Sequence, residues 1–228
     1  MMRIITDIFT ADNFRFLMAG LCNTLFISVF TVAVSVVLGT ALAICRNYGR
    51  GAVRLAASIY IEIFRNTPLL LWILICIFML RFGTSMGRGG LALTLYTSSV
   101  IAEIMRGGLN SIAKGQFEAA RSQGFNFFQT LEYIILPQCF RRVVPSLMSQ
   151  IITTIKDTSF LAQFAIAELF FNAKVLMSTL PQKVHITSAH IFVIFIFVAL
   201  VYFAINFLLS CIVRKLNKNS AATSGHSH

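Results

Sequence analysis

Charged residues are scarce in this sequence, and their scarcity excludes an ordinary soluble protein. Asp, Glu, Lys and Arg make up 12% of the 228 residues, whereas 57% are hydrophobic. The mean hydropathy is +0.80. A soluble domain of this size cannot bury so much apolar side chain in its core. The composition therefore predicts a membrane protein, with the lipid bilayer as its surroundings.

Negative charge is scarcer still, because eight acidic residues stand against 19 basic ones and the formal net charge is +11. In a soluble protein such an excess suggests nucleic acid. Here the basic residues lie mainly between apolar runs, where they orient the chain in the bilayer. We therefore expect no nucleic-acid partner.

Motifs for catalysis and metal binding are also missing. No GxxxxGK phosphate loop is present, so we expect no ATP site of that type in the chain. His185 and His190 have no acid beside them, and no nucleophile set is evident. The sequence predicts no catalytic residue, no metal and no cofactor in this chain, which is itself not an enzyme. The dispersed cysteines form no CxxC pair and are expected to be buried apolar residues: Cys22, Cys45, Cys76, Cys139 and Cys211.

Apolar runs of about 20 residues predict membrane-spanning helices. The third and fourth runs contain ionisable residues, which must face protein or water. These residues are Glu103 and Arg106 in the third run and Lys156 and Asp157 in the fourth. We predict an all-α membrane protein with about five transmembrane helices, over residues 17–45, 58–80, 91–112, 143–165 and 186–213.

Basic residues gather in the loops on one side of these spans, which predicts that this side is cytoplasmic. The N-terminus is then outside, and residues 1–16 form an extracytoplasmic segment before a transmembrane domain over 17–213. The C-terminus is cytoplasmic, and the small, polar segment 214–228 is expected to be a disordered tail. This orientation places the polar loop 114–137 in the cytoplasm.

That loop is the main polar segment of the chain. Residues 117–124 are expected to form a short helix that Gly124 ends in a left-handed cap, and helical spacing then resumes until Pro137 interrupts it. One interpretation is a solvated loop with a helix at the membrane surface. The other is a docking site for a soluble partner.

A resemblance favours the docking site. Glu118-Ala119-Ala120, then Gly124, Ile134 and Leu136-Pro137 at their spacing, resemble the EAA loop of permease subunits of binding-protein-dependent ABC importers. In that family the loop forms a coupling helix, which sits in a cleft of the ATPase subunit. By the resemblance Glu118 contacts the ATPase, Ala119 and Ala120 allow close approach, and Gly124 makes the turn.

The resemblance also implies a fold, partners and a location. The fold is the type I ABC importer permease fold in a bacterial plasma (inner or cytoplasmic) membrane. The partners are two ATPase subunits that bind ATP-Mg, a second permease subunit and an extracytoplasmic amino-acid-binding protein. Transport would proceed by alternating access.

Further segments resemble the polar amino acid branch of these permeases. They are residues 64–70 (FRNTPLL), 102–108 (AEIMRGG), 115–116 (GQ) and 156–159 (KDTS). Val100 and Phe160 depart from the pattern of that branch. The substrate that the resemblance implies is a polar amino acid. Members of that branch that carry cationic amino acids tend to have an additional acid near the position of Gln150, so by the resemblance its neutral amide favours glutamine, glutamate or aspartate.

Polar residues recur at three- and four-residue intervals along the fourth span, which places them on one helix face. Such a stripe is expected to line a cavity or a subunit interface. Alternatively, Ser and Thr bond to their own helix carbonyls while Lys156 pairs with Asp157. By the resemblance Lys156 holds the substrate carboxylate and Asp157 the ammonium. The expected substrate path comprises Gln150, Thr153, Thr154, Lys156, Asp157, Thr158 and Ser159.

A second polar group lies at the second and third spans and is expected to form an inner gate or interface. We expect its charged members to anchor the helices at the membrane surface and also to pair between them, and the alternative is anchoring alone. The members are Arg65, Asn66, Pro68, Glu103 and Arg106. Pro68 is expected to break its helix. Two other classes stay open, a secondary transporter and an assembly factor or sensor that binds an ATPase without moving solute.

Overall fold

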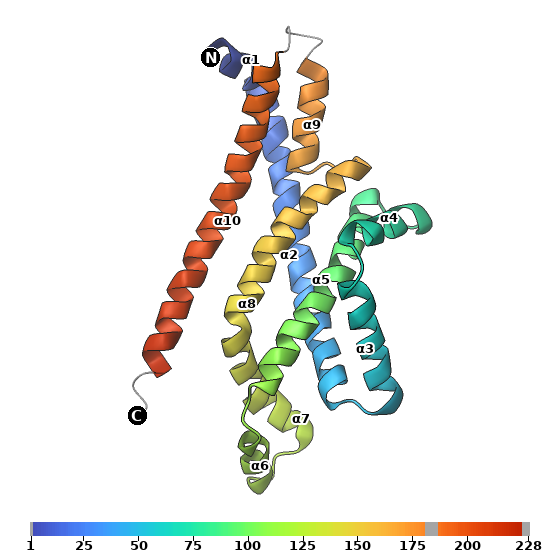
Figure 1. Cartoon of the computed structure of the whole chain (residues 1–228), viewed down its shortest axis with the longest axis vertical. Helices are drawn as coiled ribbons and strands as arrows, with labels where there is room; N and C mark the ends of the chain where they lie inside the picture. Colours follow the sequence, from blue (N-terminus) through green and yellow to red (C-terminus); the bar gives the residue numbers. More distant parts are fainter. Residues whose placement is uncertain (1, 181–186, 225–228) are drawn as a thin grey trace. The chain divides into compact units, whose positions relative to one another are not determined.

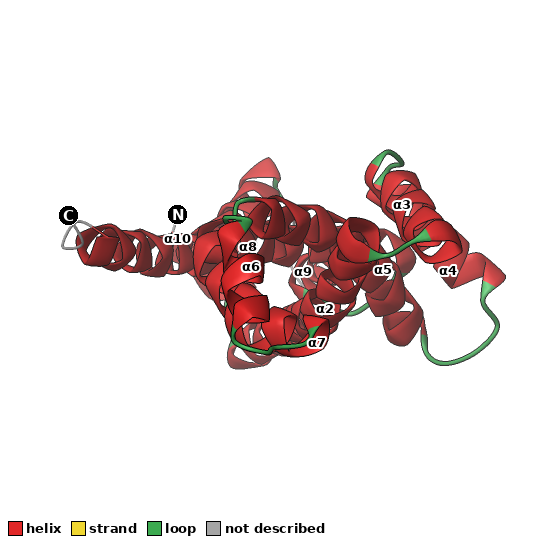
Figure 2. Cartoon of the chain, turned by 90° about the horizontal axis from the view of Figure 1, so that it is seen from below, coloured by secondary structure: helices red, strands yellow, loops and turns green. Residues whose placement is uncertain are grey.

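The computed structural model describes residues 2–180 and 187–224, and every element in this part of the chain is helical, with no strand (Figure 2). The predicted all-α fold is confirmed. Figure 1 labels the α-helices. In chain order the elements are α1 (Met2–Ile8), α2 (Ala11–Tyr48), α3 (Gly51–Arg65), α4 (Leu69–Met79), α5 (Ser85–Asn110), α6 (Gly115–Ser122), α7 (Phe127–Gln129), the π-helical η1 (Thr130–Ile135), α8 (Leu136–Asp157), the 3₁₀-helical η2 (Thr158–Phe164), α9 (Leu169–Thr179) and α10 (Ser188–Ser224).

The chain divides into two compact units. The first unit comprises residues 1–31, 70–93 and 152–212, and the second comprises 32–69, 94–151 and 213–228. Helices α2, α5 and α8 each contribute residues to both units. Each unit has a hydrophobic core of its own.

Two of the described helices, α2 and α10, are long and apolar enough to cross a membrane, and the number rises to four if each of two bent helix pairs is one span. These pairs are α3 with α4, and the stretch 127–164 with α9. Helix α5 contains the expected span 91–112 and has 26 residues, but it is less apolar than α2 and α10. The structure thus supports a multi-pass helical protein without fixing five spans.

The run 58–80 is two helices, whereas the sequence predicted one span. Helix α3 ends at Arg65 and α4 begins at Leu69. Pro68 lacks an N–H group, and the residue before a proline avoids helical backbone. Asn66 closes α3, because its backbone N–H and its side-chain amide both donate to the Glu62 carbonyl, over 3.2 and 2.9 Å. The expected break at Pro68 is therefore present.

The last helix is longer than expected. Helix α10 continues to Ser224, whereas the sequence predicted a span that ends at Val213 and a disordered tail over 214–228. Segment 214–224 contains lysine, leucine and alanine, which favour helix, and no proline or glycine. Residue 186, where this span was expected to begin, and residues 225–228 lie outside the described residues, as do Lys183 and His185.

The core of the second unit lies between α2, α5, η1 and α8. Helices in a bilayer associate through close van der Waals contact, so small residues at their contacts matter. Gly108 is such a contact, because a Cβ atom there would clash with Cγ1 of Val143 and lie 2.7 Å from Sγ of Cys139, both on α8. The buried members of this core are Ala43, Ile101, Met105, Leu109, Ile112, Leu131, Ile135, Cys139, Val143 and Leu147.

The core of the first unit lies between α1, the beginning of α2, α9 and α10. The rings of Phe9 and Phe197 pack with their centroids 4.8 Å apart. Gly20 of α2 lies against the start of α9, where a Cβ atom would be 2.9 Å from the Glu168 carbonyl oxygen. The buried members are Ile8, Leu17, Leu169, Ala173, Leu176, Leu180, Ile194 and Val198.

Two neighbouring glycines provide a matched test of the contact between α5 and α8. Gly108→Ala forces a methyl group into Val143 and is expected to lower the free energy of unfolding by about 1–3 kcal/mol. Gly107→Ala is the control, because a Cβ atom there meets nothing within 4 Å. It is expected to be neutral or to stabilise the helix by up to about 1 kcal/mol. Thermal unfolding in detergent measures both, and equal midpoints for the two variants would contradict the contact.

Candidate functional site

The predicted coupling segment begins with helix α6, which ends as the sequence led us to expect. Gly124 has a φ of +84°, in the left-handed region. The N–H of Gly124 donates to the Arg121 carbonyl (2.9 Å), and that of Phe125 donates to the Ala120 carbonyl (3.1 Å). This pair of bonds is a Schellman cap. The predicted helix and its glycine cap are confirmed.

The residues of α6 divide into an exposed face and a packed one. Glu118 and Ala119 are exposed. Ala120 is only 2% exposed and packs against its own subunit, so it serves internal packing as well as any close approach of a partner. Beside the exposed face lies a hollow of about 360 Å³ with Tyr48, Lys114, Phe117, Glu118, Arg121, Phe127 and Thr130 along its walls.

The chain returns from α6 through a capped turn and a π-helical stretch. Asn126 and Gln129 form a capping box at α7, each side chain accepting a backbone N–H over 2.9 Å. In η1 the wider helical turn continues until the N–H of Leu136 donates to Leu131. The sequence predicted that Pro137 interrupts the helix, and this prediction is wrong. Helix α8 follows η1 directly and continues through Pro137, at its second residue.

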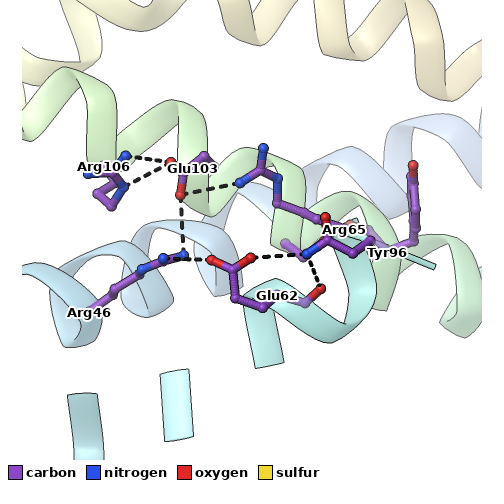
Figure 3. A network of polar contacts seen from close by, with 8 residues as sticks. Arg46, Glu62, Arg65, Tyr96, Glu103 and Arg106 are labelled. Atoms are coloured by element: carbon purple, nitrogen blue, oxygen red, sulfur yellow. Dashed lines mark hydrogen bonds and ion pairs between the residues drawn. The ribbon is translucent and has the colours of Figure 1, made fainter. Parts of the chain in front are cut away.

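Five charged side chains from α2, α3 and α5 form an ion-pair network in the second unit (Figure 3). Glu103 is its centre. Its Oε1 accepts from Arg106, over 3.0 Å from Nε and 2.5 Å from Nη2. Its Oε2 lies 3.4 Å from Nη1 of Arg46 and 3.5 Å from Nη1 of Arg65. The expected pairing between helices is thus present.

Arg46 links this centre to the break in the second apolar run. Its Nη2 donates to Oε1 of Glu62 (2.7 Å), and Oε2 of Glu62 accepts from Asn66 (3.0 Å). Arg46 and Glu103 are 22% and 23% exposed, so water screens their attraction only in part. The sequence singled out Glu103 but treated Arg46 only as an orienting charge, because its partners are 16 and 57 residues away.

The expected substrate-path residues lie along α8 and η2. Gln150 belongs to the second unit, and Thr153 to Ser159 belong to the first. Thr154 and Thr158 are fully buried, and the Thr158 hydroxyl donates to the Ile155 carbonyl (2.8 Å), as the back-bonding alternative expects. Lys156 is exposed and Asp157 half-buried, and the structure records no ion pair within 4 Å between these two residues.

A buried acid that sequence reasoning missed lies just beyond this stretch, in the first unit. Glu168 has no exposed surface and caps the start of α9. Its Oε1 accepts from the N–H of Phe171 (2.6 Å), and its Oε2 accepts from the hydroxyls of Tyr202 (2.9 Å) and Thr24 (3.3 Å). Thr24 in turn accepts from the N–H of Leu169 (3.1 Å). Glu168 therefore joins α2, α9 and α10.

An available signal for Glu168 was its isolation, because a single acid between apolar residues demands buried partners. Two neighbouring amides strengthen the junction. Asn23 donates to the Ala167 carbonyl (2.7 Å), and Asn172 donates to the Phe16 carbonyl (2.7 Å).

No group of three or more His, Cys, Asp or Glu side chains in the described residues could hold a metal ion.

Removing the central charge of the network tests its contribution to stability. Glu103→Gln leaves three guanidinium groups around a neutral amide and is expected to lower the free energy of unfolding by about 1–2 kcal/mol. High salt should reduce the difference in thermal midpoint between the variant and the native protein, because it screens the ion pairs. Glu132→Gln, at an exposed acid in η1, is the control. Identical thermal midpoints for all three proteins would show that the network contributes nothing.

The Glu168 cap is expected to contribute more. Glu168→Ala removes the acceptor of one backbone N–H and two hydroxyls in a buried site, at a cost of about 2–4 kcal/mol. Glu168→Gln keeps one acceptor oxygen and the side-chain volume, so about half of that loss should be recovered. Thermal unfolding of both variants in the same detergent is the measurement. A Glu168→Ala protein as stable as the native one would rule out this assignment.

Comparison with known proteins identifies the family. Residues 35–220 match the family described as binding-protein-dependent transport system inner membrane component. The chain is 38% identical over 215 residues to the probable glutamine ABC transporter permease protein GlnM of Bacillus subtilis, covering 91% of this chain and 94% of that protein. It is 32% identical over 212 residues to the glutamine transport system permease protein GlnP of Escherichia coli, covering 89% and 91%.

Solved structures agree with this result. A crystal structure of an amino acid ABC transporter with histidines superimposes with a TM-score of 0.79 at 26% identity, over 91% of this chain and 95% of that one. The MetNI methionine ABC transporter, in an inward-facing conformation, shares the fold with a TM-score of 0.70 at 18% identity, over 91% and 99%. The chain belongs to the family of inner membrane components of binding-protein-dependent transport systems, the permease subunits of ABC importers.

Proposed function

We propose that the chain carries glutamine or a closely related polar amino acid across the membrane, driven by ATP hydrolysis in separate subunits. The observation that carries the proposal is the geometry of α6. This short helix has a firm glycine cap and exposes Glu118 and Ala119, as a docking element requires. It lies between α5 and α8 in the chain, so a force on α6 acts on two long helices.

The partners follow from this role. Two ATPase subunits with ATP-Mg bind the exposed faces of two coupling segments, one from each of two permease subunits, and a binding protein delivers the amino acid from outside. Glu118 makes the charged contact, Gly124 sets the turn, and Leu136 and Pro137 begin the return helix. This chain supplies no ATPase site. The family disfavours a secondary transporter, because members of this family work with an ATPase and a binding protein.

The substrate path is assigned to the polar residues at the end of α8 and in η2. Lys156 is exposed and holds the amino acid carboxylate, and Asp157 holds its ammonium group. No Lys156–Asp157 ion pair within 4 Å is present in the described residues, so both side chains keep room for direct contacts with a substrate. Gln150, Thr153, Thr154, Thr158 and Ser159 complete the path, and the neutral amide of Gln150 suits glutamine. Arg65, Asn66, Pro68, Glu103 and Arg106 form the inner gate.

The docking role is tested by purification of the tagged chain from its native membrane with mass spectrometry of the proteins that accompany it. We expect an ATPase subunit with the native chain and its loss in Glu118→Lys, because the variant reverses the contact charge. Asp12→Lys is the matched control, since it makes the same charge change at an exposed residue at the start of α2.

The substrate is tested by competition. Unlabelled glutamate or aspartate should inhibit the uptake of labelled glutamine more strongly than arginine does.

Two outcomes would contradict the proposal in different ways. An ATPase absent from the native chain, or retained fully by Glu118→Lys, would remove the docking role. No uptake of labelled glutamine, or uptake that arginine inhibits strongly while glutamate and aspartate do not inhibit it, would leave docking intact and overturn the substrate.

A further inference from the structure

The connection between α5 and α6 is short and is fastened to α8 at both ends. Helix α5 ends at Asn110 and α6 begins at Gly115. At the first end, Nη1 of Arg142 donates to the carbonyl oxygen of Ser111 and lies 3.2 Å from its hydroxyl. At the second end, Nε2 of Gln138 donates to Oε1 of Gln116 (3.1 Å). All four residues belong to the second unit.

The two donors are arranged to act together. Gln138 and Arg142 are four residues apart on α8, which places them on one face of the helix. The Arg142 guanidinium meets the carbonyl end of α5, where the helix dipole favours a positive charge. The Gln138 amide also donates to the Ile134 carbonyl (3.0 Å), which fixes its direction.

The neighbouring, buried face of α8 packs directly on α5. Cys139 and Val143 lie against Gly108, and the thiol of Cys139 is 3.7 Å from the Met105 carbonyl oxygen. Ser111 continues this contact, because its hydroxyl donates to the Gly108 carbonyl (2.7 Å). The base of α6 is thus held by hydrogen bonds to a helix pair that is already tightly packed.

We propose that Gln138 and Arg142 are positioning residues that transmit movement of the coupling helix α6 to α8, the helix whose other end carries Lys156 and Asp157. In the described structure neither residue is hydrogen-bonded to the exposed Glu118 or Ala119 of α6. Without their two bonds the 111–114 connection bends when α6 is displaced, and α8 stays in place. This inference rests on the proposed docking of α6 to an ATPase.

The test is the number of ATP molecules hydrolysed per amino acid transported, measured with the complete importer and its binding protein in proteoliposomes. A residue needed only for stability lowers hydrolysis and transport together and leaves this ratio unchanged. A positioning residue lets hydrolysis continue while transport falls. For Arg142→Gln combined with Gln138→Leu we expect the ratio to rise at least about fivefold, because a charged and a neutral hydrogen bond are both lost.

Three further variants sharpen the result. Arg141→Gln is the control, because the Arg141 side chain is exposed and makes no hydrogen bond or ion pair in the described residues. It should keep the native ratio. Arg142→Lys keeps a charged donor for the end of α5 and should recover part of the coupling. Gln116→Leu should raise the ratio as Gln138→Leu does, and the two together should add little.

The outcomes separate this inference from the function on which it rests. A native ratio in the double variant, or hydrolysis and transport that fall in proportion, would overturn the positioning role while docking stands. An ATPase that does not accompany the native chain would remove the docking role and this inference with it. A raised ratio with the ATPase still bound supports both.

Discussion

The structure depends on the need to satisfy backbone hydrogen bonds where helices end inside an apolar environment. Each helix end leaves backbone groups without a partner, and a bilayer offers no water to replace it. Three polar side chains meet this need at breaks in the chain. Asn66 caps the end of α3, Arg88 donates to the carbonyls of Ile77 and Leu80 at the end of α4, and Glu168 accepts at the start of α9. These residues allow apolar runs to break without exposing unpaired backbone.

The same constraint explains why charged residues gather at these breaks. Glu62 receives the Asn66 amide that closes α3, and it also pairs with Arg46 of α2. Arg46 then reaches Glu103 of α5, so the cap of one helix becomes a link between three. A charge placed to satisfy the backbone is thereby available for pairing between helices. A gate built from the network would use charges that the fold already requires. Any change in the pairing of Glu62 would then alter the cap at the break between α3 and α4.

Local features of the fold could be predicted from sequence, and features that depend on distant partners could not. Gly124 and the helix before it were predictable because a Schellman cap is decided within a few residues. The break at Pro68 was predictable for the same reason. Glu168 and Arg142 were not, since their partners lie up to 144 and 31 residues away. The wide turn of η1 also escaped prediction, because the sequence indicates a helix break at Pro137, whereas η1 leads directly into α8 at Leu136 and the helix continues through the proline.

The substrate-path segment that contains Thr158 and Ser159 is held differently from the coupling helix α6, and this difference suits their roles. Thr158 and Ser159 lie in the 3₁₀ turn that leads to Glu168, whose carboxylate is completely buried and accepts bonds from α9, α10 and α2. Residues assigned to the substrate therefore stand beside a junction that is costly to disturb, as a binding site requires. Helix α6 is held at its base by the side chains of Gln138 and Arg142, which lie near the surface and tie residues 111 and 116 to α8. A segment that a partner moves in every cycle needs a face open to that partner and a tie to the helix that it moves. The chain thus buries the hydrogen bonds that hold the substrate-path segment and keeps near the surface those through which movement enters.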